Sequence, residues 1–372
     1  MAALRSWVDK VRNMSLPHPV RVMNVCGGHE RSITMAGLRG ALPKGLELIP
    51  GPGCPVCVCP EEDIYLAIQI ALSGKATLVA FGDMLRVPAN VPKGQPRTLE
   101  QARAAGGDVR PIASPQEAWR IATEHPERTV VFFAAGFETT MAPVAARIVQ
   151  GLPRNLQFVV TGRLTWPAVS MLLDSGDPGF EALIAPGHVS TVMGPEEWGF
   201  VVEKHNIPTA IAGFESRDIL VALHSVLQQL RNGEAHLDNC YGRAVRNGGN
   251  PLARRLMNEV FDVVDANWRG IGSIPASGYQ LNATWSSHDA RERYADLADD
   301  SRRRVGQMPA GCSCAQVVLG KIYPNACPLY GKACTPRNPV GPCMVSDEGA
   351  CRIWWAGGVR NDEKADAEPA KA

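Results

Sequence analysis

The chain has 372 residues, of which 45% are hydrophobic and 20% are charged, and its formal net charge is +1. This composition is typical of a soluble globular protein and supplies enough apolar side chains for two or three cores. The near-neutral charge gives no general reason to expect nucleic acid as a partner, and no apolar run approaches the ~20 residues of a membrane helix.

Short apolar runs alternate with helical segments from residue 20 onward. Helices are expected over residues 31–40 and 61–74 and after each later strand. This alternation predicts the α/β class, with Rossmann-like parallel sheets and crossover helices, and it predicts a ligand-binding cleft beyond the carboxyl ends of the strands. The expected strands cover residues 20–25, 46–50, 76–82, 129–136, 156–162, 182–187 and 208–214.

A stretch rich in glycine and proline, residues 88–115, interrupts this rhythm and suggests a domain boundary or a long excursion. We predict one α/β domain over residues 1–126 and a second over 127–235, with a return of the chain to the first domain as the alternative. Residues 236–360 are predicted to form a helical or irregular C-terminal domain, with one helix running from Pro251 to Trp268. The polar tail, residues 361–372, is expected to be disordered.

Ten of the eleven cysteines fall into two groups, and Cys240 stands alone between them. The N-terminal residues lack the apolar run of a secretory signal, so a cytoplasmic location is expected, and a reducing compartment disfavours a static disulfide framework. The late cysteines lack the paired C-x-x-C knuckles of a zinc ribbon, and their wide spacing favours a [4Fe–4S] cluster over structural zinc or scattered core thiols. The early group is Cys26, Cys54, Cys57 and Cys59; the late group is Cys312, Cys314, Cys327, Cys334, Cys343 and Cys351.

Two early motifs could carry chemistry. In "CGGH", Cys26 ends a predicted strand and could be a nucleophile or a soft metal ligand, with His29 as a base, proton donor or second ligand. In "GPGCPVC", Cys54 and Cys57 could close a disulfide or share a metal ion. A buried cysteine and a structural metal knuckle are the respective structural alternatives.

Other strand-end loops carry weaker signals. "GFETT" places Glu138, Thr139 and Thr140 at a strand-to-helix junction, where helix capping is the simpler explanation. Asp83 and His188 occupy similar positions. The sequence contains neither a P-loop nor a G-x-G-x-x-G motif, so no motif predicts nucleotide binding.

Seven motifs, in this order, closely resemble the HypD family of [NiFe]-hydrogenase maturation factors. The resemblance extends from about Val20 to Trp355. The motifs are "CGGHE", "GPGCPVCVCPEED", "GFETT", "PGHVSTVMG", "WRGIGSIPASG", "GKACTP" and "CMVSDEGAC".

The resemblance implies two α/β domains facing a cleft, a C-terminal [4Fe–4S] domain, and a scaffold on which the Fe(CN)2CO group is assembled. It implies a HypC-type chaperone that shares the iron, and a HypE-type carrier, served indirectly by a HypF-type protein, that delivers cyanide. Cys26 would bind the iron, with His29 beside it. Cys54 and Cys57 would be redox-active thiols fed by the cluster, and Glu138, Thr139 and Thr140 would line the cleft. The ligands favoured for the cluster are Cys312, Cys327, Cys334 and Cys351.

The chain departs from the family pattern at several positions. Glu30 and Arg31 follow His29 where a threonine and a second histidine are common, and Cys59 adds a thiol after the C-x-x-C. Cys314 and Cys343 would be left over from the cluster. A protonated His29 would favour cyanide delivery. The alternatives are a free-standing iron–sulfur thiol/disulfide oxidoreductase and a non-catalytic interaction protein with structural zinc.

Overall fold

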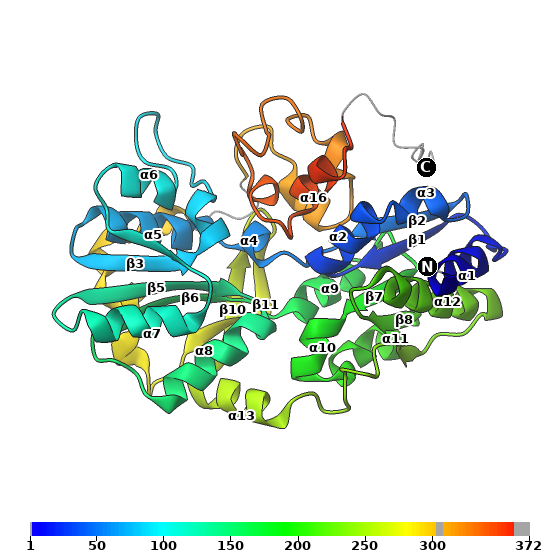
Figure 1. Ribbon diagram of the computed structural model, residues 1–372, viewed down its shortest axis with the longest axis horizontal. Coiled ribbons are helices and arrows are strands. Elements are labelled where there is room, and N and C mark those ends of the chain that lie inside the picture. Colours follow the sequence, from blue (N-terminus) through cyan, green and yellow to red (C-terminus); the bar gives the residue numbers. More distant parts are fainter. Residues whose placement is uncertain (1, 303–307, 361–372) are drawn as a thin grey trace.

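The computed structural model describes residues 2–302 and 308–360 and contains two parallel sheets and a hairpin (Figure 1). This confirms the predicted α/β class. Sheet A has the order β2-β1-β7-β8-β9, and sheet B has the order β4-β3-β5-β6. Sheet A comprises β1 (Val20–Asn24), β2 (Leu46–Pro50), β7 (Ala182–Pro186), β8 (Thr209–Ala212) and β9 (Leu237–Asn239). Sheet B comprises β3 (Ala76–Phe81), β4 (Val109–Ile112), β5 (Thr129–Gly136) and β6 (Leu156–Gly162).

The central strands are continuous apolar runs because helices cover both of their faces. In β5, every residue after Thr129 is buried. Phe132 pairs with Phe158 of β6 in the sheet register and also contacts Phe81, with ring centroids 5.5 Å apart. The continuous apolar runs in the sequence therefore correspond to strands at the centre of a sheet.

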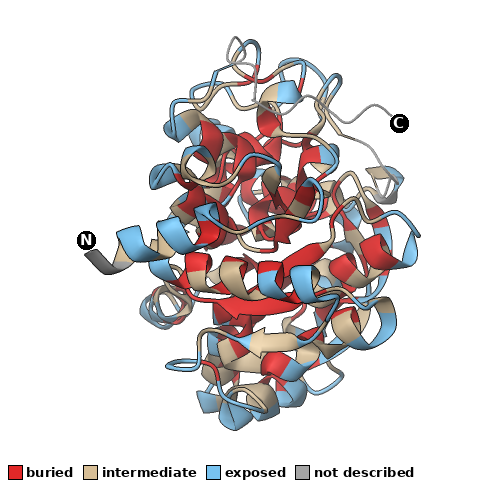
Figure 2. Cartoon of the chain, turned by 90° about the vertical axis from the view of Figure 1, so that its right-hand side faces the viewer, coloured by how far each residue is buried: buried red, intermediate tan, exposed pale blue. Residues whose placement is uncertain are grey.

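Helices connect the strands and cover the sheets, leaving the buried residues at the centre of the molecule (Figure 2). Against sheet A, α1 and α12 share one core, while against sheet B α7 and α8 share another. The helices are α1 (Ala2–Arg12), α2 (Gly27–Met35), α3 (Leu38–Ala41), α4 (Pro55–Val58), α5 (Glu61–Leu72), α6 (Leu99–Ala104), α7 (Pro115–Glu124), α8 (Glu138–Gln150), α9 (Thr165–Asp174), α10 (Gly187–Met193), α11 (Gly199–His205), α12 (Ser216–Asn232), α13 (Pro251–Val260), α14 (Ala290–Arg293), α15 (Cys314–Val318) and α16 (Ala350–Ala356).

The strands of the two sheets are not contiguous in the chain. β1 and β2 lie in sheet A with β7, although the chain between β2 and β7 builds all of sheet B. The break expected at residue 126 falls between β4 and β5, which belong to the same sheet. Each sheet thus takes strands from both of the predicted segments 1–126 and 127–235.

Two local predictions were wrong. The Gly/Pro-rich stretch 88–115 contains α6 and the edge strand β4, so it is part of sheet B. The helix expected to reach Trp268 ends at Val260, and an antiparallel hairpin follows, formed by β10 (Phe261–Trp268) and β11 (Gly272–Leu281). The β-branched pair Val263–Val264 fits the pleated hairpin better than a helix interior.

The cysteine-rich segment, residues 308–360, lies across the junction of the two sheets (Figure 1). Trp354 donates a hydrogen bond of 2.6 Å to Glu30 on the sheet A side, and Ser346 donates one of 3.0 Å to Asp83 after β3 of sheet B. This confirms a cysteine-rich C-terminal region, which contacts both α/β layers. Within residues 2–302 and 308–360, no helix combines the length and apolar character needed to span a membrane. The predicted disordered tail lies outside the described residues.

Candidate functional site

Cys26 lies where β1 ends and α2 begins, at the N-cap of that helix. The loop after β2 passes directly against it: a Cβ on Gly53 would approach the Cα of Cys26 to 2.5 Å, so only glycine fits there. Gly27 donates a backbone hydrogen bond of 3.1 Å to the Gly53 carbonyl. Parallel pairing of β1 with β2 thus brings the "CGGH" and "GPGCPVC" loops together, as their strand-end positions predict.

The Cys26 thiol is held in its protonated form in the metal-free protein. Burial, with the nearby Glu348 carboxyl as a second cause, raises the pKa of Cys26 to about 12. The backbone N–H groups of His29 and Gly28 act in the opposite direction and lower the pKa. A thiolate at this position would be stabilised by the same two N–H groups.

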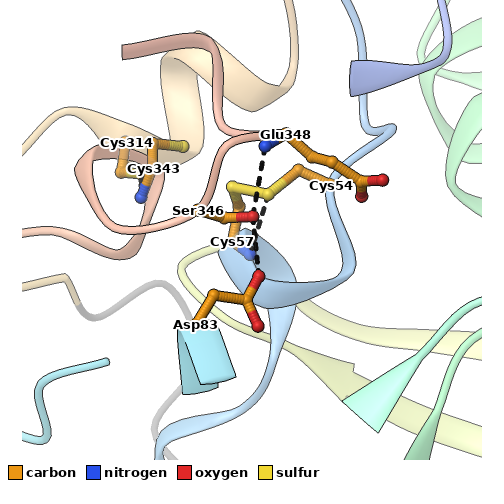
Figure 3. Close-up of a disulfide and its surroundings, with 7 residues drawn as sticks. All are labelled: Cys54, Cys57, Asp83, Cys314, Cys343, Ser346 and Glu348. Atoms are coloured by element: carbon orange, nitrogen blue, oxygen red, sulfur yellow. Dashed lines mark hydrogen bonds between the residues drawn. A yellow bond between two sulfur atoms is a disulfide. The ribbon is translucent and has the colours of Figure 1, made fainter. Parts of the chain in front are cut away.

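Cys54 and Cys57 form a disulfide at the start of α4, with their Cα atoms 5.3 Å apart (Figure 3). Pro55 occupies the first helical position, and the backbone N–H of Cys57 donates to the Cys54 sulfur at 3.2 Å. Both cysteines are almost fully buried. From the β10–β11 turn, the backbone N–H of Arg269 donates to the carbonyl of Val58, fixing the end of α4.

One small cavity joins these groups. It is lined by Cys26, by both cysteines of the disulfide, and by Cys343 and Glu348 of the cysteine-rich segment. Its volume is about 10 Å³, roughly the room that one water molecule needs. The structure therefore places three of the four early cysteines around one small cavity.

Two carboxyl groups lie beside the disulfide (Figure 3): Asp83, whose strand-end position left its role open in the sequence, and Glu348, which sequence reasoning missed. Ser346 donates to Asp83 at 3.0 Å and accepts from the backbone N–H of Glu348 at 3.2 Å, so the three residues form a chain next to the sulfurs (Figure 3). Burial, with Asp83 as a second cause, raises the pKa of Glu348 to about 7. The motif "SDEG" contains Ser346 and Glu348, but nothing local in it points to a disulfide almost 300 residues earlier.

His29 is fully buried on α2 and stacks on Phe214, with ring centroids 4.8 Å apart. Its Nε2 lies 3.1 Å from the carbonyl oxygen of Ala212, so Nε2 carries the proton in this contact. Burial lowers the pKa of His29 to about 4. The imidazole is therefore neutral near pH 7, which argues against the expected role as a protonated donor. Within the described residues, its Nδ1 has no hydrogen-bond partner.

The three residues of the "GFETT" motif have different surroundings. Glu138 is fully buried and accepts two hydrogen bonds from Thr165, one from the backbone N–H and one from the hydroxyl, both at 2.7 Å. These two bonds hold the N-terminus of α9 in place, and α9 connects β6 of sheet B to β7 of sheet A. Burial raises the pKa of Glu138 to about 7. Thr139 is exposed and Thr140 is half-buried, and neither lines the cysteine cavity.

A second cavity gathers all six late cysteines. Within residues 2–302 and 308–360, no three His, Cys, Asp or Glu side chains are already placed to hold a single metal ion. Two sulfurs accept backbone N–H groups: Cys314 from Cys343 at 3.2 Å, and Cys334 from Val340 at 3.4 Å. Such N–H···S bonds stabilise thiolates, and soft thiolate donors suit iron–sulfur clusters, so this cavity fits the predicted cofactor chemically. The cavity is lined by Cys312, Cys314, Cys327, Cys334, Cys343 and Cys351.

Cys343 lines both cavities and so connects the late cysteines to the cavity of the disulfide. Burial opposes ionisation of Cys314, but hydrogen bonds with Cys312 and Cys343 outweigh it and lower the pKa of Cys314. The two thiols that would be left over from the cluster, Cys314 and Cys343, lie together, and Cys343 also lines the cavity of the disulfide (Figure 3). The geometry does not separate them from the four favoured ligands, since all six face one space.

Comparison with known proteins identifies the family. The family model HypD, described as the hydrogenase formation hypA family, matches residues 2–358. The chain belongs to the HypD family. The hydrogenase maturation factor HypD of Rhodobacter capsulatus is 39% identical over 350 residues, which cover 93% of this chain and 91% of that protein. HypD of Escherichia coli is 39% identical over 345 residues, covering 91% and 89%, and HypD of Azotobacter vinelandii is 40% identical over 348 residues, also covering 91% and 89%.

These matches confirm the resemblance carried by the motifs. They extend through both sheets and the cysteine-rich segment of a HypD chain, so the match includes both cysteine cavities. Hydrogenase maturation is therefore the process in which this chain takes part.

Proposed function

We propose that this chain is the scaffold on which the Fe(CN)2CO group of a [NiFe] hydrogenase is assembled. In this proposal, Cys26 holds the iron together with a cysteine of a HypC-type chaperone. Cyanide comes from a HypE-type carrier that a HypF-type protein has loaded. The observation that carries the proposal is the small cavity shared by Cys26 and the Cys54–Cys57 disulfide.

Cys26 has the properties that an iron ligand needs. A soft thiolate suits low-spin Fe(II) bearing cyanide and carbonyl. Because the metal-free thiol is protonated, binding iron displaces a proton, and the N–H groups of Gly28 and His29 then face the thiolate. The start of α2 adds a positive dipole end at the same atom. Neutral His29 lies beside this loop as a fixed neighbour through its bond to Ala212.

Cys54 and Cys57 are proposed as the redox-active pair. Reduction of their disulfide takes up two electrons and two protons and leaves two thiols. We propose Cys312, Cys327, Cys334 and Cys351 as ligands of a [4Fe–4S] cluster, which when bound supplies one-electron transfers from a low-potential donor. Cys343 lies between the two cavities, which supports a functional connection between them.

A free-standing thiol/disulfide oxidoreductase is the competing function. An enzyme that reduces protein disulfides needs an accessible attacking sulfur. Here Cys54 is 4% and Cys57 is 1% exposed, so a macromolecular disulfide has no direct access to them. The buried pair favours an internal role in cofactor assembly.

Infrared spectroscopy tests the scaffold function. The full chain is purified anaerobically with a HypC-type partner, and cyanide and carbonyl stretching bands are measured. We expect the bands in the wild type, their loss in Cys26→Ala, and their retention in Cys240→Ala, which changes a half-buried cysteine outside both cavities. Bands that persist in Cys26→Ala would refute iron binding at this residue, and dithiol-linked turnover without any bands would support the oxidoreductase.

Metal analysis tests the cofactor independently. A [4Fe–4S] cluster gives about four iron and four acid-labile sulfide per chain. Zinc without sulfide would instead support the interaction protein with a structural zinc domain.

A further inference from the structure

α2, which begins directly after Cys26, packs against the part of the cysteine-rich segment that runs from Glu348 to Gly357. A Cβ on Gly27 would lie 2.6 Å from the Cβ of Glu348, and a Cβ on Gly357 would collide with the side-chain methyl of Thr34. The helix of Cys26 therefore touches the cysteine-rich segment at both of its ends. Between these two contacts lies Glu30.

The Glu30 carboxylate is buried in the seam between α2 and α16, with only 2% of its side chain exposed. Trp354 of α16 donates its indole N–H to Oε1 at 2.6 Å, and Arg39 places Nη2 at 2.9 Å from both oxygens. Asn24 of β1 donates to Oε2 at 3.1 Å, and Thr34 donates to Oε1 at 3.3 Å. The donors to the two oxygens together come from four different segments: β1, α2, α3 and α16.

The charge of this carboxylate is compensated locally. Arg39 is its counter-ion, also donates to the carbonyl of Leu48 in β2, and lies over the Trp354 ring with its Cζ 5.0 Å from the ring centroid. Asn24 donates in addition to the carbonyl of Ile49. A buried carboxylate with this many donors is costly to leave partly unbonded, so the arrangement resists displacement of any one member.

The position of Glu30 connects this network to the site. It lies one helical turn after Cys26 and lines the same cavity as Cys26 and the disulfide. Because Cys26 is the N-cap of α2, any shift of that helix moves the thiol. Gly53 already contacts the Cys26 backbone, so little movement can be absorbed without opening the cavity.

We propose that Glu30 is a positioning residue that fixes the helix of Cys26 against α16 and so holds the Cys26 thiol in the cavity beside the disulfide. Its relevance to iron assembly rests on the proposed function. The placement of the thiol itself does not, since it is a property of the metal-free chain. This assigns a role to the residue at which the chain departs from the family pattern.

Alkylation of Cys26 tests the proposal without iron. The full chain, with the Cys54–Cys57 disulfide oxidised, is treated with iodoacetamide, and the rate at Cys26 is followed by peptide mass spectrometry. We expect Glu30→Gln, which loses the charge and half of the acceptor capacity, to raise the rate at least fivefold. Trp354→Phe, which removes one donor, should raise it at least twofold. Glu100→Gln, in the exposed first turn of α6, should leave it unchanged.

A thermal melt of each variant separates positioning from general stabilisation. A purely structural role would lower the melting temperature and leave the Cys26 rate in the folded protein unchanged. If Glu30→Gln does not fold, the folded Trp354→Phe variant decides: an unchanged Cys26 rate there overturns the proposal.

The infrared experiment on the wild type keeps the two proposals distinguishable. Missing iron–cyanide bands in the wild type refute the scaffold function, whatever the alkylation rates. Bands in the wild type together with unchanged Cys26 rates in both variants refute only the role of Glu30.

Discussion

The buried carboxyl of Glu138 predicts a specific dependence of stability on pH. Its pKa is raised from 4.5 to about 7, mainly by burial. The folded protein therefore binds this proton more tightly than the unfolded chain does. The associated stability is fully present below pH 4.5 and is lost as the pH rises through about 7. With roughly 1.4 kcal/mol per pKa unit, the loss between these limits is about 3 kcal/mol.

Glu138→Gln isolates this contribution. Glutamine keeps an acceptor for the backbone N–H of Thr165 and stays neutral at every pH. The free energy of unfolding is measured by urea denaturation at pH 5, 6, 7 and 8. We expect the variant to gain about 2.5 kcal/mol relative to the wild type between pH 5 and pH 8. Most of the gain should occur between pH 5 and 7.

Two further variants serve as controls for this measurement. Glu100→Gln, an exposed carboxyl also in a first helical turn, should follow the wild type at each pH. Thr165→Val removes the hydroxyl donor to Glu138, and since that bond lowers the pKa, the loss of stability should move to higher pH. A difference between Glu138→Gln and the wild type that is constant from pH 5 to 8 would refute the reasoning.

Three other predictions concern the cysteines and the core. Cys59 is buried, and burial raises its pKa to about 12. Iodoacetamide added to the folded protein should therefore leave Cys59 unlabelled in peptide mass spectra, and rapid labelling would contradict this. Cys59→Ala should not change hydrogenase maturation. Cys334→Ser should lower iron and sulfide content severalfold in chemical analysis, while Cys240→Ser should not; equal content in the two would exclude Cys334 as a ligand. Phe132→Ala should cost about 3–5 kcal/mol in urea denaturation because the side chain is fully buried, and a loss below ~1 kcal/mol would contradict its place in the core.

The sequence predicted the individual strands better than their assembly. β5 is recognisable because a central parallel strand is apolar on both faces, and β6, although it is the last strand of sheet B, is also buried along its whole length. The assignment of strands to sheets was not predictable, because a strand of either sheet has the same local pattern. β1 pairs with β7 rather than with β3, and only the tertiary packing decides this.

The candidate site was predictable where it depends on strand ends. Cys26 and Cys54 follow neighbouring parallel strands, so their convergence is a consequence of sheet geometry. Glu348 reaches the same cavity from the far end of the chain, which no local pattern signals. The neutral state of His29 also depends on burial that is created by Phe214 and the segment after β8.

The interleaved order of the strands determines when each sheet can be completed as the chain leaves the ribosome. β1 and β2 emerge first, yet β7 is not available to β1 until the whole of sheet B has been translated. The cavity around Cys26 is completed later still, by Cys343, Glu348 and Ala350. Long-range pairing of this kind slows folding and leaves early strands unpaired in the nascent chain. Cys26 is thus among the first residues made, while its cavity is completed near the end of synthesis, so a prematurely terminated chain carries the cysteine without its cavity.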